Sequence, residues 1–149
     1  MATRMEQPKP WRFATRAGKQ AFPNDPRNAH DMRAFVAEFL CSVEVPEHIT
    51  DEILMAVGEV VANACRHGRR PRDPGDVTVL CDLADVSVTL TVVDEGAGFD
   101  VNEVLGEGTP ALLSPGGRGF FLMRQLMDRV DVESDSTGTI IVLCRELPR

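Results

Sequence analysis

The sequence is poor in aromatic residues, in basic charge and in long apolar runs. Aromatic residues make up 5 % of the 149 residues, so the core must be aliphatic. The net charge of -7 argues against direct binding to nucleic acid, which requires a cationic surface that displaces counterions. The chain contains no apolar run long enough to span a bilayer and no signal peptide. We therefore expect a cytoplasmic protein with no nucleic-acid or membrane partner.

Several catalytic and metal-binding motifs are also missing. The cysteines, at positions 41, 65, 81 and 144, form no C-x-x-C pair, so they indicate small buried residues rather than a zinc site. There is no G-x-S-x-G, which argues against a nucleophile elbow. The G-x-x-x-x-G-K-[ST] loop and the protein-kinase catalytic loop are absent as well. If this chain binds a nucleotide, it does so with another fold.

The composition that remains is that of one globular domain. Hydrophobic residues make up 43 % and charged residues 26 % of the chain, and the length suits a single core. Residues 1–17 are polar and contain Pro8 and Pro10, so we expect a flexible N-terminal arm. The rest, residues 18–149, is expected to form the domain.

Hydrophobic periodicity predicts the order strand, helix, helix, two strands, loop, helix, two strands. This order indicates an α/β fold of the α+β two-layer type, with a mixed, mainly antiparallel sheet covered on one face by about three helices. The second helix is expected to follow Thr50 as its N-cap, and a tight turn is expected at Ala84-Asp85. The expected strands are 19–22, 77–83, 86–93, 128–133 and 139–145, and the expected helices are 28–42, 51–66 and 120–127, with a long loop over 99–117.

The helix expected at 51–66 carries two stripes. Helical spacing predicts a buried apolar stripe and places four polar residues on another face: Glu59, Asn63, Arg66 and His67. Magnesium prefers oxygen ligands and keeps several waters, so the amide oxygen of Asn63 is suited to bind such an ion directly. The Glu59 carboxylate is suited to hold a metal-bound water or to accept the proton of an attacking hydroxyl. His67 also suits the negative end of the helix dipole. An exposed helix face explains the same residues and, taken alone, is the better explanation.

Asp94 ends a β-branched run and is followed by Gly96 and Gly98. A carboxylate at a strand end can accept a hydrogen bond from an exocyclic amine such as that of adenine. A turn that leaves the strand explains the same pattern equally well.

A third signal consists of Gly116, Gly117 and Gly119 before an apolar helix. The exposed N–H groups and the dipole of a helix start favour anions such as phosphates. A hinge is the alternative, and the motif is weak by itself. Arg118 suits either a phosphate or solvent, and solvent is the simpler expectation.

These three motifs, in this order along the chain, resemble the GHKL-type ATP-binding domain, which is the Bergerat fold of gyrase, heat-shock chaperones and histidine kinases. The resemblance runs from about Asp51 to Val142, most of the chain. Its boxes are Glu59-x3-Asn63-Ala64-x2-His67-Gly68, Asp94-x-Gly96-x-Gly98, Gly117-x-Gly119 and the late pair Gly138-Thr139.

The resemblance implies roles for these residues. Glu59 is implied as the general base, Asn63 as the Mg²⁺ ligand and Asp94 as the adenine anchor. The further residues expected to bind ATP are Arg66, His67, Gly96, Gly98, Gly117, Arg118, Gly119, Phe120 and Thr139.

Within this group the chain is most similar to the RsbW-like anti-sigma-factor serine/threonine kinases of bacterial partner-switching systems. That similarity implies phosphorylation of a small STAS-like antagonist and binding of a sigma factor. It also implies a possible homodimer through the early strand and first helix, where Phe35 and Phe39 are available, although core packing explains both rings equally well.

One departure keeps a second interpretation open. Kinases of this class place an arginine just before the second glycine box, where this chain has Ser114-Pro115. The alternative is a non-catalytic ATP-binding module that acts by sequestering a partner. A third interpretation is an α/β interaction domain in which the boxes are accidental.

Overall fold

The computed structural model describes residues 16–101 and 115–148. The expected arm lies outside these residues except for positions 16 and 17, as does most of the expected loop over 99–117. The elements are β1 (Arg16–Pro23), the short 3-10 helix η1 (Pro26–Asn28), α1 (Ala29–Ser42), α2 (Glu47–His67), β2 (Asp76–Ala84), β3 (Ser87–Asp94), α4 (Pro115–Leu126), β4 (Arg129–Asp135) and β5 (Gly138–Glu146).

The five strands form one sheet in the order β1-β2-β3-β5-β4. Every neighbouring pair in this sheet is antiparallel, so the expected parallel component is absent from the described strands. The reason is that β1 and β2 are joined by two helices, which return the chain to the end of the sheet that it left. The predicted element order and the α+β fold class are confirmed.

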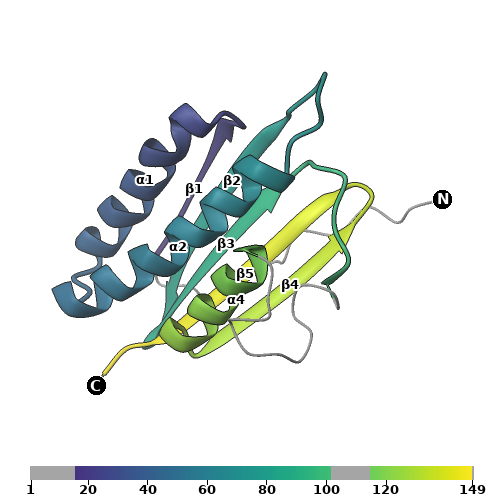
Figure 1. Ribbon diagram of the computed structural model, residues 1–149. Helices are drawn as coiled ribbons and strands as arrows, with labels where there is room; N and C mark the ends of the chain where they lie inside the picture. The colour runs from purple at the N-terminus through teal and green to yellow at the C-terminus, as the bar shows by residue number, and fades with distance from the viewer. Residues whose placement is uncertain (1–15, 102–114, 149) are drawn as a thin grey trace.

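Helices α1, α2 and α4 lie side by side on one face of the sheet (Figure 1). The core between the two layers is mainly aliphatic, as the scarcity of aromatic residues predicts, and Met32, Leu40, Leu90 and Leu143 in it are fully buried. Its buried aromatic side chains among the described residues are Phe22, Phe39 and Phe120. The apolar stripe expected on α2 is buried throughout, at Ile53, Val57, Val60, Val61 and Ala64. The face of the sheet that points away from the helices also carries buried residues: Leu80, Asp82, Thr91 and Ile140.

Helix α2 begins at Glu47, earlier than the sequence predicted. Pro46 precedes it, and its carbonyl accepts hydrogen bonds from the N–H groups of Ile49, at 3.1 Å, and Thr50, at 2.9 Å. A proline is well tolerated at a helix start because the N–H that it lacks would have no partner in the helix. Thr50 therefore lies in the first turn, where its hydroxyl donates to the Val45 carbonyl at 3.4 Å, and it is not the N-cap.

Two other boundaries differ from the prediction. The turn between β2 and β3 is formed by Asp85 and Val86, with Asp85 at φ +56°. Helix α4 begins at Pro115, so the glycines expected to precede the helix lie in its first turns. A proline at the first helical position outweighs the low helix propensity of the three glycines that follow.

Only one of the four cysteines is buried. Cys81 lies in the core, and burial raises the pKa of its thiol to about 12, so it is inert as a nucleophile. Cys41 is exposed, and Cys65 and Cys144 are half-buried. The expectation of four small buried residues is wrong for these three, because an apolar neighbourhood in sequence does not fix which face a residue occupies.

Arg145 ties two helices to the sheet at one end of the molecule. Its Nη1 donates to Glu52 Oε2 on α2 at 2.6 Å and to the carbonyl of Leu126, the last residue of α4, at 2.5 Å. The backbone N–H of Asp128 donates to the Cys144 carbonyl at 2.9 Å. The C-terminal end of α4 is therefore fixed to both α2 and β5.

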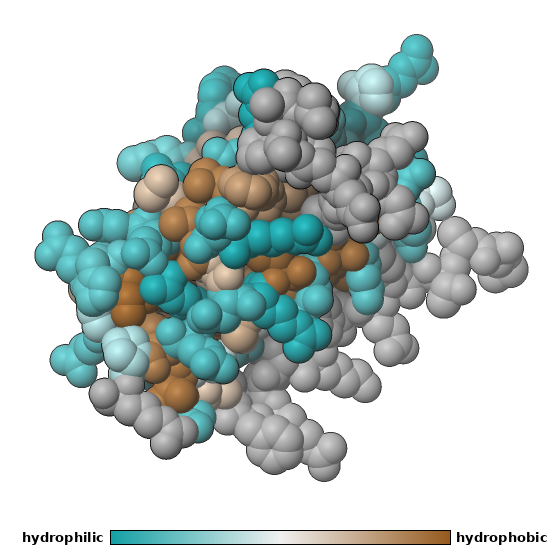
Figure 2. Space-filling view, turned by 60° about the horizontal axis from the view of Figure 1, so that its bottom comes forward, coloured by the Kyte–Doolittle hydropathy of each residue, from teal (hydrophilic) through white to brown (hydrophobic). Residues whose placement is uncertain are grey.

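The surface is mainly polar on the side turned forward in Figure 2, where hydrophilic residues enclose smaller apolar areas. Within the described part of the chain, the large apolar side chains that are exposed are Met55 and Phe121. None of the described helices is both long enough and apolar enough to cross a bilayer.

Candidate nucleotide-binding site

The three glycine-containing boxes meet around the C-terminal half of α2. A Cβ atom at Gly119 of α4 would lie 2.8 Å from Glu59 Oε2. A Cβ at Gly68, after α2, would lie 2.6 Å from Asp94 Oδ2, and one at Gly96 would lie 2.6 Å from the Cα of Gly68. Real Cβ contacts are not this short, so these glycines allow the three segments to approach one another. Residues far apart in the sequence thus lie close together.

Glu59 and Asn63 lie one turn apart on α2 in different environments. Glu59 is half-buried, whereas Asn63 is only 7 % exposed. Neither Oδ1 nor Nδ2 of Asn63 has a hydrogen-bond partner among the described residues. An unsatisfied buried amide costs about 1–3 kcal/mol, so this side chain is a strong candidate for ligand contact. The simpler expectation of an exposed helix face is wrong for Asn63.

Asp94 is buried at the end of β3, with 8 % of its surface exposed. Burial raises the pKa of its carboxyl group, and hydrogen bonds from the backbone of Gly96 and Thr139 oppose that rise. One of these bonds joins the Gly96 N–H to Asp94 Oδ1 at 3.0 Å. The carboxyl group is therefore held in place by the loop that follows it.

Thr139 lies opposite Asp94 in the β3–β5 register and is 3 % exposed. Its hydroxyl lies 2.8 Å from the Ser134 hydroxyl, and either can donate. The Ser134 hydroxyl also accepts a hydrogen bond from the Phe99 N–H at 2.9 Å. The threonine and the carboxylate thus form two fixed polar groups on neighbouring strands.

The loop after Asp94 packs directly on the turn between β4 and β5. Gly98 has φ +79°, and a Cβ there would collide with the Asp135 carbonyl oxygen. Gly138 has φ +148°, and a Cβ there would collide with the Asp94 carbonyl oxygen. Side chains rarely adopt such φ values, so both glycines are required by the close approach of two backbones.

The remaining predicted residues are less centrally placed. Arg66 and His67 are exposed at the end of α2, and Arg66 Nε donates to the Ala62 carbonyl at 3.4 Å. Arg118 is also exposed, while Phe120 is 3 % exposed and its ring packs on that of Phe99 at a centroid distance of 6.0 Å. The Phe120 side chain therefore belongs to the core. Gly117 lies in the first turn of α4, and its surroundings are outside the described residues.

Sequence reasoning missed two polar side chains that hold the site together. The Asn24 amide donates to the carbonyls of Ala64 and Gly68, both at 3.1 Å, and so fixes the end of α2. Arg70 donates to the carbonyls of Glu95, at 3.1 Å, Gly96, at 3.3 Å, and Ser136. Asn24 follows a proline and Arg70 lies in a polar loop, so neither position carried a signal of its distant partner.

The side chains at this site are suited to bind magnesium only when phosphates supply further ligands. The described residues contain no group of three or more His, Cys, Asp or Glu side chains that could hold a metal ion. Magnesium bound to a nucleotide typically needs only one or two protein groups beside the phosphates and water. The orphaned amide of Asn63 can supply one such oxygen.

Comparison with known proteins identifies the family. Residues 22–145 match the family described as the histidine kinase-like ATPase domain. The chain belongs to this family. The expected GHKL-type resemblance is therefore confirmed over most of the chain.

Within the histidine kinase-like ATPases, the relatives are anti-sigma factors and serine kinases. The chain is 33 % identical over 137 residues to an anti-sigma F factor of Clostridium novyi (strain NT), covering 87 % of this chain and 93 % of that protein. It is 34 % identical over 97 residues to the serine-protein kinase RsbW of Bacillus velezensis (strain DSM 23117 / BGSC 10A6 / LMG 26770 / FZB42), covering 60 % and 61 %. These names agree with the RsbW-like class and with the kinase activity that the sequence predicted.

A solved structure shows the same fold. The RsbU and RsbW domains of Rv1364c from Mycobacterium tuberculosis superpose with a TM-score of 0.70 at 21 % identity, covering 91 % of this chain. This chain spans 33 % of that longer protein. The likeness confirms the two-layer architecture described above.

Proposed function

We propose that this protein is an ATP-dependent serine/threonine kinase of the anti-sigma-factor type. In this role it phosphorylates a small antagonist protein and, in its other state, sequesters a sigma factor. One observation carries the proposal: buried Asn63, with neither polar atom satisfied among the described residues, lies one turn from Glu59, which faces the Gly119 backbone. Relatives that are named anti-sigma F factor and serine-protein kinase support it.

The adenine ring is proposed to bind between the end of α2 and the end of β3. The Asp94 carboxylate accepts a hydrogen bond from the exocyclic amine, and the buried Thr139 hydroxyl lies beside it on β5. A guanine base presents an oxygen at the corresponding position, so two hydrogen-bond acceptors would face one another at the buried carboxylate. Such a mismatch costs binding free energy, so the site favours adenine over guanine.

The phosphates are proposed to lie between α2 and the start of α4. The N–H groups in the first turn of α4 and its dipole favour anions, and the Asn63 oxygen is available for Mg²⁺. When bound, magnesium neutralises charge on the phosphate oxygens. Asn63 positions that charge, and the absence of a side chain at Gly119 leaves Glu59 room to approach.

Glu59 is proposed as the general base. The hydroxyl oxygen of a serine or threonine on the antagonist forms a bond to the γ-phosphorus, and the bond from that phosphorus to the β–γ bridging oxygen breaks, releasing ADP. The proton of the hydroxyl passes to the Glu59 carboxylate. Such a base contributes about 10²–10⁴-fold to the rate.

The non-catalytic alternative is favoured by one feature, the Ser114-Pro115 pair in place of an arginine before the second glycine box. A module that only binds ATP and sequesters a partner has no need of a base at position 59. The half-buried glutamate against Gly119 and the kinase name of a relative both favour the enzyme.

The proposed partners are a STAS-like antagonist and a sigma factor in the cytoplasm. A homodimer through β1 and α1 is also proposed, since β1 is an edge strand. The packing of Phe35 on Phe22, at a ring-centroid distance of 6.2 Å, supports a role of Phe35 in the fold itself, so dimerisation rests on the edge strand rather than on this ring.

The test combines binding with phosphate transfer. Calorimetric titration with Mg-ATP and transfer of label from γ-labelled ATP to candidate antagonists are measured for wild type, for Glu59→Ala and for Glu38→Ala, whose carboxylate is exposed on α1. We expect Glu59→Ala to bind ATP and lose transfer, and Glu38→Ala to retain both. Undiminished transfer by Glu59→Ala would exclude the base. Tight ATP binding without transfer to any antagonist would favour the non-catalytic module.

A further inference from the structure

We propose that Arg70 is a positioning residue that sets the base selectivity of the nucleotide site. It does so by fixing the loop after Asp94 to the turn between β4 and β5. The inference rests on the proposed function, because it assumes that adenine binds at Asp94. It adds a residue that lies outside all four boxes of the sequence.

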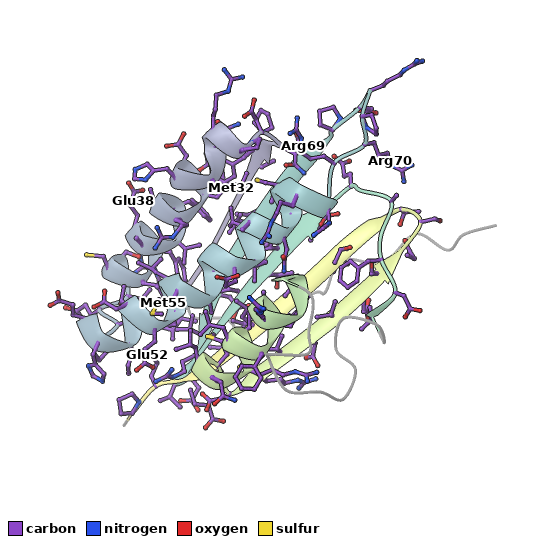
Figure 3. All side chains as sticks on the ribbon, viewed as in Figure 1. Met32, Glu38, Glu52, Met55, Arg69 and Arg70 are labelled. Atoms are coloured by element: carbon purple, nitrogen blue, oxygen red, sulfur yellow. The ribbon has the colours of Figure 1, made fainter. Side chains whose placement is uncertain are left out.

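The first observation is the set of hydrogen bonds that Arg70 makes. Its Nε donates to the Glu95 carbonyl at 3.1 Å, and its Nη2 donates to the carbonyls of Gly96, at 3.3 Å, and Ser136. The first two acceptors follow β3 and the third lies in the β4–β5 turn, 66 residues further along the chain than Arg70. One side chain thus joins three segments: its own loop after α2 and the two segments that it contacts. Figure 3 labels Arg70 in that loop, at the end of the molecule where α2 and β3 terminate.

The second observation is that these segments carry the proposed base contacts. The Gly96 N–H donates to Asp94 Oδ1 at 3.0 Å, so the position of Gly96 fixes the orientation of the carboxylate. Ser136 is two residues from Gly138, which packs on the Asp94 carbonyl, and three from Thr139. A shift of either segment therefore moves Asp94 relative to Thr139.

The third observation is that the arrangement suits arginine and not lysine. A guanidinium group presents five N–H donors in a rigid plane, whereas an ammonium group is a compact point charge. A lysine ammonium has three donors but no planar fork, so it cannot reproduce the fixed geometry in which Arg70 holds acceptors on two segments. Arg72 lies in the same loop and is exposed, and no side-chain hydrogen bond is seen for it among the described residues, so it provides a matched control.

A direct contact between Arg70 and a phosphate is the competing explanation, and base selectivity separates the two. If Arg70 positions Asp94, its loss reduces the preference for ATP over GTP, because Asp94 distinguishes the two bases. If Arg70 contacts phosphate, its loss weakens ATP and GTP by the same factor and leaves the ratio unchanged.

The experiment measures dissociation constants of Mg-ATP and Mg-GTP by competition with a fluorescent ATP analogue. Wild type, Arg70→Gln, Arg70→Lys and Arg72→Gln are compared. We expect Arg70→Gln to bind ATP about tenfold more weakly and to lose most of its preference over GTP, Arg70→Lys to recover little of either, and Arg72→Gln to match wild type. If Arg70→Gln does not fold, Arg70→Lys, which keeps the charge, carries the test.

The outcomes separate the inference from the function on which it rests. An Arg70 variant with the wild-type selectivity ratio overturns the inference, whether ATP binding is unchanged or is weakened equally for both nucleotides. Full recovery of selectivity in Arg70→Lys overturns it as well, since a point charge would then suffice. A wild-type protein that binds neither nucleotide overturns the proposed function itself, and with it the premise of this inference.

Discussion

The two ends of the proposed site are built in opposite ways. At the adenine end the polar groups are already paired: Asp94 accepts from Gly96, Thr139 pairs with Ser134, and Arg70 bonds to backbone carbonyls. At the phosphate end, the Asn63 amide is buried and neither of its polar atoms has a partner among the described residues.

The proposed function therefore predicts a finished surface at the adenine end, where the polar groups are already paired, and an unfinished surface at the phosphate end, which Mg²⁺ and phosphates would complete. A preorganised group loses little entropy on binding and gives selectivity. An unsatisfied buried amide costs about 1–3 kcal/mol in the free protein, and a ligand that satisfies it returns that free energy. Nucleotide binding should therefore stabilise the fold, by about 2.7 kcal/mol at a hundredfold excess over the dissociation constant.

The largest effect is expected from Gly138→Ala, at the finished end. A Cβ at φ +148° collides with the Asp94 carbonyl, which is backbone and cannot move aside. We expect the free energy of unfolding to fall by about 3 kcal/mol or more in chemical denaturation. Gly18→Ala is the control, because its Cβ would meet the Phe35 ring at an ordinary 3.5 Å; equal losses in both variants would contradict the tight packing inferred here.

Asn63→Leu tests the unfinished end and should have the next largest effect. Removing an unsatisfied amide leaves the stability of the free protein unchanged or raises it, while Mg-ATP affinity falls at least tenfold, about 1.4 kcal/mol. Thermal melts and calorimetric titration with and without EDTA measure the two quantities. Loss of stability together with unchanged affinity would show that the amide has a structural partner instead.

Gly119→Ala is expected to have a smaller effect, a loss of activity without a loss of stability. The added Cβ would lie 2.8 Å from Glu59 Oε2, and the end of a flexible side chain can move away. Phosphate transfer should fall about fivefold, whereas the free energy of unfolding should rise by up to about 1 kcal/mol from the better helix propensity of alanine. Gly58→Ala on α2, with its nearest outside contact at 3.6 Å from Arg33 Nε, should gain stability without losing transfer.

The smallest effect concerns Asp94→Asn in the free protein. Burial raises the pKa of Asp94 above its ordinary 3.8, so the ionised group costs stability above the raised pKa, and that cost disappears as the pH falls toward 3.8. The asparagine keeps the acceptor for Gly96 without the charge. We expect its Tm to exceed that of wild type at pH 7 and the difference to shrink on acidification; a difference that grows at low pH would show that the carboxylate is stabilising.

The element order was predictable because it depends on local periodicity. The apolar stripe of α2, the strand pair around Asp85 and the last hairpin all follow from spacing over a few residues. The start of α2 at Glu47 was missed because Pro46 was interpreted as a break rather than as the residue that precedes a helix. The start of α4 at Pro115 was missed because the glycines that follow this proline were interpreted as part of a loop.

The site was predictable only as a set of residue types. The sequence motifs identified Glu59, Asn63 and Asp94 as candidates. The burial of Asn63, however, depends on which segments pack against α2, and the sequence of that helix alone does not determine it. Asn24 and Arg70 act on residues 25 to 66 positions away. Such contacts form only when the sheet has brought the ends of α2, β3 and β5 together, so no local sequence pattern predicts them.

The anchoring of α4 by Arg145 has a consequence for motion. The helix is 12 residues long, about 18 Å, and its last turn is fastened to α2 and β5 through the guanidinium of Arg145 and the Asp128–Cys144 backbone bond. Gly119, whose backbone faces Glu59, lies about 10 Å along the helix axis from that fastened end. A tilt of α4 about its fastened end would therefore change the distance between Gly119 and Glu59, whereas Asp94 and Thr139, which lie on β3 and β5, would keep their positions.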